Sequence, residues 1–431
     1  MLTINNVTLH TGDALAVLRT LPNASVHCCV TSPPYWGLRD YGVKGQLGLE
    51  RTPEEYVANM VAIFREVRRV LRDDGTLWLN LGDSYSNDGK WGGSSGGKHV
   101  NALHGQTGIG RNKNFTGLKP KDLVGIPWRV AFALQADGWY LRSDIIWAKP
   151  NPMPESVTDR PTKSHEYVFL LSKSPRYWYD AEAVKDASTC DRVRGTHGWS
   201  HVPNGGDNSG LSRRETDPKR NLRSVWTIAT HPYPEAHFAT FPPKLVEPCI
   251  KAGCPERCCP TCGAGWARVV ERSPMEVRTS AKGTEKFAMG LRTSTSGTMT
   301  TPPRSTTLGF RPTCKCYDAR YRIDFPKAHN ARKRLQHHTA GRWFPRVRMR
   351  PGLPTWTTTY GVVLDPFAGS GTTGQVAIEQ GRGAILIELN PAYGALIERR
   401  VRTASATATE ASRQVPLPFS TEPPIQPSLQ W

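Results

Sequence analysis

Apolar residues in the first eighty positions form two short runs separated by a segment with helical spacing. Val26 to Val30 is an apolar run that ends at Thr31-Ser-Pro-Pro-Tyr-Trp36, which predicts a strand leading into a rigid turn. Thr52-Pro-Glu-Glu55 predicts the start of a helix, and apolar residues recur at helical spacing through Arg72. Asp73-Asp-Gly75 is expected to stop this helix, and Thr76 to Leu81 predicts a second strand.

The later apolar segments predict further strands and helices in alternation. We expect helices at residues 127–136 and 372–380, and strands at residues 141–147, 166–172, 361–364 and 384–389. The last strand, helix and strand follow one another as in a parallel crossover unit. The pattern therefore predicts an α/β fold built on a mostly parallel twisted sheet.

Polar stretches without clear periodicity divide the chain into parts. Residues 86–118 are rich in Gly, Ser and Asn and predict a flexible surface loop. The Ser, Thr and Pro content of residues 404–431 predicts a disordered tail. We expect one half of the main domain in residues 1–180, and the other half in residues 226–253 and 352–403. Between these parts lie two insertions, at residues 181–225 and 254–351.

Charge changes this picture by suggesting a partner. Lys and Arg total 56 against 37 Asp and Glu, a formal net charge of +19, which favours a polyanion such as double-stranded DNA. A generally basic, solvated surface is the alternative. Neither a long apolar stretch nor a signal-like N-terminus is found, so we expect a soluble cytoplasmic protein without a membrane partner.

A glycine-rich segment follows the strand predicted at 361–364. The glycine spacing of a nucleotide-binding turn is present in Asp365-Pro-Phe-Ala-Gly-Ser-Gly371. Glu388 follows about 20 residues later, where a carboxylate can accept hydrogen bonds from ribose hydroxyls. Spacing alone also fits a nicotinamide enzyme, or a plain tight turn. Asp365 favours S-adenosylmethionine, because a carboxylate there can pair with an ammonium group and would repel a pyrophosphate.

A second candidate site is the turn Ser32-Pro33-Pro34-Tyr35. The amino nitrogen of cytosine or adenine is a poor nucleophile, because its lone pair is delocalised into the ring. The Ser32 oxygen and the Pro33 carbonyl can accept both amino hydrogens, while the two prolines fix the backbone. Tyr35 offers a flat face to a base that has left the duplex stack.

Together the two motifs resemble the family of DNA amino-methyltransferases, in the order called beta, where the catalytic motif precedes the cofactor motif. The resemblance implies a Rossmann-like methyltransferase fold and a set of site residues. Expected cofactor contacts are Asp13, Thr240, Phe241, Asp365, Pro366, Phe367, Gly369, Ser370, Gly371, Thr372 and Glu388. Expected base-pocket residues are Trp36, Trp147, Lys149 and His165, with pairing to a backbone carbonyl as the favoured alternative for His165.

Two close cysteine pairs stand in the second insertion. Cys259, Cys262, Cys314 and Cys316 supply the four thiolates of a tetrahedral structural zinc, which predicts a small zinc-ribbon-like insert. Cys254 and Cys258 are nearby competitors for the ligand set, and free reduced thiols are the alternative. Zinc here would stabilise an insert with little core and take no part in the chemistry.

Within the family that the chain resembles, Ser-Pro-Pro-Tyr usually accompanies methylation of cytosine at N4 and Asp-Pro-Pro-Tyr accompanies adenine. The preferred hypothesis is therefore a site-specific N4-cytosine DNA methyltransferase, with residues 181–225 as the target-recognition insert. An N6-adenine enzyme and a zinc-bearing DNA-binding protein with an inactive site are the alternatives. The recognition sequence, pairing with a restriction nuclease and the oligomeric state stay open.

Overall fold

A nine-stranded sheet forms the centre of the molecule. The computed structural model describes residues 1–38, 40–86, 117–187, 219–231, 241–272, 276–278, 299–301, 305–316 and 359–414. Along the sheet the strands are ordered β1 (Leu2–Ile4), β2 (Val7–Thr11), β15 (Gly383–Glu388), β14 (Val362–Asp365), β3 (Val26–Thr31), β4 (Leu71–Leu81), β6 (His165–Ser172), β5 (Tyr140–Ala148) and β9 (Val225–Thr227).

Strand direction divides this sheet into a parallel block and an antiparallel side. β2, β15, β14, β3 and β4 pair in parallel, whereas β6 pairs antiparallel with both β4 and β5. The predicted mostly parallel sheet is confirmed. Strand β9 pairs with β5, so Val225 lies in the main sheet and not in the insertion expected at 181–225.

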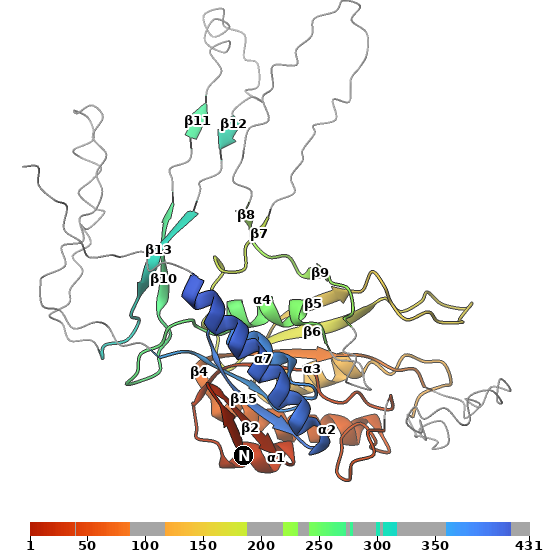
Figure 1. Ribbon diagram of the computed structural model, residues 1–431. Helices are drawn as coiled ribbons and strands as arrows, with labels where there is room; N and C mark the ends of the chain where they lie inside the picture. Colours follow the sequence, from red (N-terminus) through yellow and green to blue (C-terminus); the bar gives the residue numbers. More distant parts are fainter. Residues whose placement is uncertain are drawn as a thin grey trace, which may run out of the picture.

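Helices cover both faces of the sheet (Figure 1). One face carries α1 (Ala14–Thr20), α2 (Pro53–Val70) and α3 (Ile126–Ala136), with a core that includes Phe64 and Leu134. The other carries α4 (Pro243–Gly253), α6 (Thr372–Glu379) and α7 (Ala392–Gln414), with a core that includes Val246 and Val376. The result is a three-layer Rossmann-like arrangement.

Helix α2 shows how local sequence sets the boundaries. The Thr52 hydroxyl accepts the amide of Glu55 over 3.2 Å, and Pro53 occupies the first turn, where its missing N–H costs nothing. The helix ends at Val70, earlier than predicted, because Leu71 already pairs with Val26 as the start of β4. Strand pairing therefore overrides the stop signal expected at Asp73-Asp-Gly75.

The expected disorder from Ala404 onward is wrong for the first part of that segment. Helix α7 continues to Gln414, and Ile397, Val401 and Ala404 are buried at helical spacing. This apolar stripe packs on α6, so burial outweighs the low helix propensity of the Ser and Thr residues around it. Residues 415–431 lie outside the described residues.

Small antiparallel ribbons project from this body (Figure 1). Strand β10 (Ala267–Arg272) pairs with β13 (Ser305–Arg311), and β11 (Glu276–Arg278) pairs with β12 (Met299–Thr301). A third ribbon joins β7 (Asp186–Ala187) to β8 (Lys219–Arg220). The flexible loop expected at 86–118 falls almost wholly outside the described residues. Among the described helices, none combines the length and apolar character needed to cross a membrane.

Candidate active site

The two motifs meet at the edge of the sheet where the parallel strands end. Strands β3 and β14 are direct neighbours, with Cys29 opposite Leu364. At their ends the Thr31 hydroxyl donates to the Asp365 carboxylate over 2.7 Å. The turn with Ser32 and the glycine-rich loop therefore start side by side, at the edge where open α/β sheets bind ligands.

Asp365 has a different environment from the one that the sequence suggested. Its carboxylate is fully buried and accepts hydrogen bonds from Thr31, from the Thr373 hydroxyl at 2.6 Å and from the Phe367 amide at 3.1 Å. Burial raises the pKa of Asp365 to about 6, although these hydrogen bonds oppose the rise. The side chain is not among those that line the cavity described below, and its hydrogen bonds hold the start of the loop in place.

The glycine-rich loop is shaped by its neighbours on β15 and α7. The Gly369 amide donates to the Glu388 carboxylate over 2.7 Å, and Arg400 donates to the Ser370 hydroxyl over 2.7 Å. Gly371 has φ 83° and an added Cβ would lie 3.1 Å from Ile397, so this position needs glycine for both conformation and space. Gly371 caps α6 and does not line the cavity.

Two acidic side chains lie at the neighbouring strand ends. Glu388 ends β15 and also accepts the Asn390 amide over 2.9 Å, and burial raises the pKa of its carboxyl. Asp13 follows β2 and caps α1 by accepting the Ala16 amide over 2.8 Å. Both carboxylates are therefore oriented by backbone donors at the same edge as the glycine-rich loop.

A cavity of about 850 Å³ opens at this edge. Its size falls within the range of small-molecule sites. It is lined by most of the residues that the sequence singled out, namely Asp13, Ser32, Pro33, Pro34, Tyr35, Trp147, Lys149, Phe241, Pro366, Phe367, Gly369, Ser370, Thr372 and Glu388. The turn from Ser32 to Tyr35 and the glycine-rich loop thus share one cavity.

Two expected base-pocket residues lie elsewhere. Trp36 is only 3% exposed, packs in the core under α2 and donates its indole N–H to the Glu50 carbonyl over 3.1 Å. His165 starts β6 and makes an edge-to-face contact with Tyr167, outside the cavity lining. The assignment of Trp36 is corrected, because its ring is buried behind the turn. His165 contacts a neighbouring ring, and its role at the base stays a prediction. Thr240 lies outside the described residues.

At one end of the cavity, polar side chains from three strands form a hydrogen-bonded cluster around Tyr35. The Tyr35 hydroxyl donates to Glu166 over 2.7 Å and lies 3.2 Å from the Ser32 hydroxyl. Burial, and then the nearby Glu166 carboxylate, hold the pKa of Tyr35 well above its ordinary value, so the phenol keeps its proton. Lys149 pairs with Glu166 and lies 4.4 Å from the Trp147 ring centroid.

Sequence reasoning did not single out Asn80, Gly82 or Glu166 in this cluster. Asn80 is a polar residue inside an otherwise apolar strand, and Glu166 begins the strand predicted at residues 166–172, where no motif marked it. An added Cβ on Gly82 would lie 2.5 Å from the Tyr35 ring, so glycine leaves the space that the ring occupies. A polar residue near the end of a buried strand was the signal that could have found Asn80.

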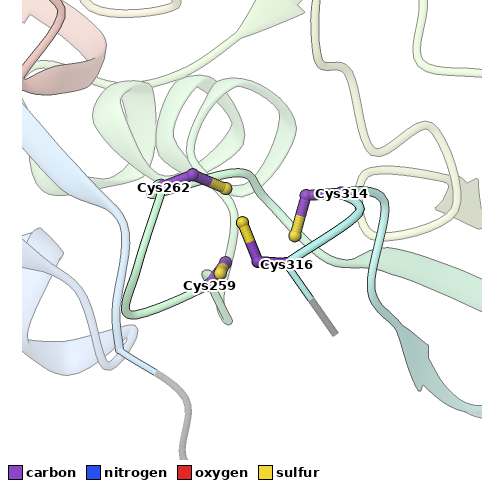
Figure 2. Close-up of side chains that lie close together, drawn as sticks. All are labelled: Cys259, Cys262, Cys314 and Cys316. Carbon is purple, nitrogen blue, oxygen red and sulfur yellow. The ribbon is translucent and has the colours of Figure 1, made fainter. Parts of the chain in front are cut away.

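The four cysteines of the two pairs come together in space (Figure 2). The sulfur atoms of Cys259, Cys262, Cys314 and Cys316 all lie within 4.8 Å of one another. Four thiolates around one zinc ion would lie about 3.8 Å apart, given Zn–S bonds of about 2.3 Å. The four sulfur atoms therefore fit tetrahedral coordination of one metal ion if the distances between them shorten slightly.

The competitors Cys254 and Cys258 are not part of this cluster. Both are buried, and the Cys258 sulfur lies 3.4 Å from the ring of His27. His27 also bonds the Gly263 carbonyl at 2.8 Å and accepts the Val362 amide over 3.0 Å. These contacts attach the cysteine cluster to the starts of β3 and β14, at the opposite edge of the sheet from the cavity.

Comparison with known proteins decides the family. The family model for N6 and N4 methyltransferases, described as DNA methylase, matches residues 26–258 and 317–399. The chain belongs to this DNA methylase family. It is 50% identical to the Type II methyltransferase M.Cfr9I of Citrobacter freundii over 252 residues, which are 58% of this chain and 74% of that protein.

A second relative of this chain is also a Type II methyltransferase. The chain is 48% identical to the Type II methyltransferase M.SmaI of Serratia marcescens over 242 residues, 56% of this chain and 73% of that protein. Among solved structures, PvuII DNA methyltransferase (cytosine-N4-specific) aligns over 95% of this chain and 93% of its own, with 16% identity and a TM-score of 0.47. The predicted Rossmann-like methyltransferase fold agrees with the family and with the observed sheet.

Proposed function

We propose that this DNA methyltransferase transfers a methyl group from S-adenosylmethionine to the N4 amino group of cytosine in double-stranded DNA. The observation that carries the proposal is the shared cavity: Ser32 and Tyr35 line one part of it, and the loop from Pro366 to Ser370 lines another. A base held by the first group can therefore meet a methyl donor held by the second.

The chemistry needs an amino nitrogen whose lone pair is free to attack. The Ser32 oxygen and the Pro33 carbonyl would accept the two amino hydrogens and favour a tetrahedral nitrogen. The bound donor supplies an electrophilic methyl group: the nitrogen pair bonds to the methyl carbon, the carbon–sulfur pair stays on sulfur, and one amino proton leaves to solvent water. No enzyme–base covalent bond is required.

At the donor end of the cavity, the residues suit an adenosine with an attached amino acid. Glu388 carries a buried carboxylate suited to ribose hydroxyls. Phe367, Phe241 and Tyr393 give the cavity aromatic surface for an adenine ring, and Asp13 adds a second acid. This mixture of aromatic rings and acidic acceptors supports S-adenosylmethionine over a pyrophosphate-bearing dinucleotide.

At the base end, Tyr35, Trp147 and Lys149 would surround a base that has left the duplex. The choice of cytosine rests on Ser32 in the position where adenine enzymes of the family usually carry Asp. N6-adenine methylation is the second candidate, since the same acceptors suit either amino group. The net charge of +19 favours DNA binding, and residues 181–225 are proposed to read the target sequence.

We further propose that Cys259, Cys262, Cys314 and Cys316 hold one structural zinc. The cluster joins the start of β10 to the end of β13, and Arg72 and His27 attach it to the sheet through the Cys262 and Gly263 carbonyls, each at 2.8 Å. Because the cluster lies at the edge opposite the cavity, zinc would stabilise the insertion and stay remote from methyl transfer.

Transfer of labelled methyl groups tests the enzymatic proposal. Purified chain incubated with radioactive S-adenosylmethionine and duplex DNA is expected to label the DNA. Ser32→Ala and Tyr35→Ala should abolish labelling while donor binding, measured by calorimetry, stays unchanged. DNA binding without any transfer by the wild-type chain would instead support the inactive DNA-binding alternative.

A further inference from the structure

Glu166 lies at the centre of the polar cluster beside the cavity. It stands near the start of β6, opposite Trp147 in β5. One carboxylate oxygen pairs with Lys149, and the other accepts both the Tyr35 hydroxyl at 2.7 Å and the Asn80 amide nitrogen at 3.2 Å. A single carboxylate therefore connects β3, β4 and β5 at the base end of the cavity.

These bonds fix the direction in which Asn80 presents its amide. The Asn80 nitrogen has two partners, the Glu166 carboxylate and the Tyr167 carbonyl at 3.1 Å, and both of them can only accept. The Asn80 oxygen must then face the opposite way, towards the hydroxyls of Ser32 at 3.2 Å and Tyr35 at 3.0 Å. An amide oxygen can only accept. Because the one Tyr35 proton is donated to Glu166 over the shorter distance of 2.7 Å, the Asn80 oxygen is left to accept the proton of Ser32.

The consequence falls on Ser32. Because its one proton is directed at Asn80, the lone pairs of the Ser32 oxygen are left for the cavity, where the proposed chemistry needs an acceptor. With Asn80 turned around, its nitrogen would donate to Ser32, and the serine proton would point at the base. A donor facing an amino group is repulsive, so the orientation of Asn80 decides whether Ser32 can assist the reaction.

The geometry points to Glu166 as a positioning residue that acts through Asn80 to make Ser32 a hydrogen-bond acceptor for the amino group of the target base. This inference rests on the proposed function, which uses Ser32 as that acceptor. The role needs oxygen atoms that only accept. The Glu166 side chain pairs with Lys149, which follows β5, and accepts the Tyr35 phenol and the Asn80 amide.

Glu166→Gln tests the inference with little change in shape. The new amide can donate to the Asn80 oxygen, which allows Asn80 to turn its nitrogen towards Ser32. We expect the single-turnover rate of methyl transfer to fall at least 30-fold, with binding of S-adenosylmethionine and DNA within twofold of wild type. Glu155→Gln is the matched control, since Glu155 pairs with Arg160 outside the cavity lining, and its rate should stay within twofold.

Adding Asn80→Asp to Glu166→Gln gives a readout that a structural role alone would not produce. An Asp carboxylate can only accept, so it takes the donor from Gln at position 166 and still accepts the Ser32 proton. The double variant should therefore regain at least tenfold of the rate that Glu166→Gln loses. A wild-type rate for Glu166→Gln, or a double variant no faster than Glu166→Gln, would overturn the inference. Absence of any methyl transfer by the wild-type chain would instead defeat the proposed function.

Discussion

The Thr31 hydroxyl donates to the Asp365 carboxylate over 2.7 Å, although 334 residues separate the two in the chain. Thr31 immediately precedes the turn from Ser32 to Tyr35, and Asp365 immediately precedes the glycine-rich loop. This hydrogen bond, together with the pairing of β3 and β14, fixes the distance between the two parts of the cavity. Stability and catalysis should therefore both depend on it.

Thr31→Val removes this donor at nearly constant volume. One oxygen of a buried carboxylate then loses a partner, so the free energy of unfolding should fall by about 1 to 3 kcal/mol. Urea denaturation measures the change. Thr20→Val is a suitable control, because its hydroxyl only bonds the Val17 carbonyl in an exposed position. Equal stability of the two variants would show that the Thr31 contact contributes little.

Asp365 should also make stability depend on pH. Burial raises its pKa to about 6 in the folded chain, above the ordinary value of about 3.9, so the folded state binds more protons between these pH values. The free energy of unfolding should fall, by up to about 3 kcal/mol from this group, as pH rises from about 4 to about 6. Asp365→Asn should remove this dependence of the unfolding free energy on pH. The same pH dependence in Asp365→Asn and in the wild-type chain would contradict the assignment.

Gly82→Ala should displace the Tyr35 ring. The added Cβ would meet the ring at 2.5 Å, so Tyr35 must move away from Glu166 and Ser32. We expect the single-turnover rate to fall at least tenfold while the chain stays folded by circular dichroism. Gly394→Ala on α7 is the control, since an added Cβ there meets nothing within 4 Å, and its rate should be unchanged.

The cysteine cluster predicts one zinc ion per chain, which inductively coupled plasma mass spectrometry can measure. Cys262→Ser and Cys316→Ser should lose the metal and lower the unfolding temperature by several degrees. Cys258→Ala should keep it, because the Cys258 sulfur faces His27 and not the cluster. Full zinc retention in both serine variants would exclude these four thiols as the ligand set.

Strong local patterns made much of the fold predictable. The strand at β3, helix α3 and the unit β14, α6 and β15 were expected within one or two residues, because apolar periodicity and glycine turns specify them locally. Helix α4 was not expected, since it contains Pro248 inside its span. Helix α7 was not expected either, because its stability comes from packing on α6, which no local pattern encodes.

The site was predictable where a motif carries its own geometry. Ser32 and Tyr35 were singled out because the turn offers hydrogen-bond acceptors and because a glycine-rich loop accompanies it, and the turn does line the cavity. Asp365 was placed correctly on its strand, but its hydrogen bonds to Thr31 and Thr373 come from tertiary structure. Trp36 was misplaced for the same reason: sequence adjacency to Tyr35 does not show that its ring points into the core.

The identity of the modified base tests the central claim most directly. DNA from a host that lacks its own DNA methyltransferases and expresses this chain can be digested to nucleosides and analysed by liquid chromatography with mass spectrometry. N4-methyldeoxycytidine is the predicted product, absent from cells that express Ser32→Ala. N6-methyldeoxyadenosine in its place would contradict the cytosine assignment, and the absence of any methylated nucleoside would contradict the proposed activity.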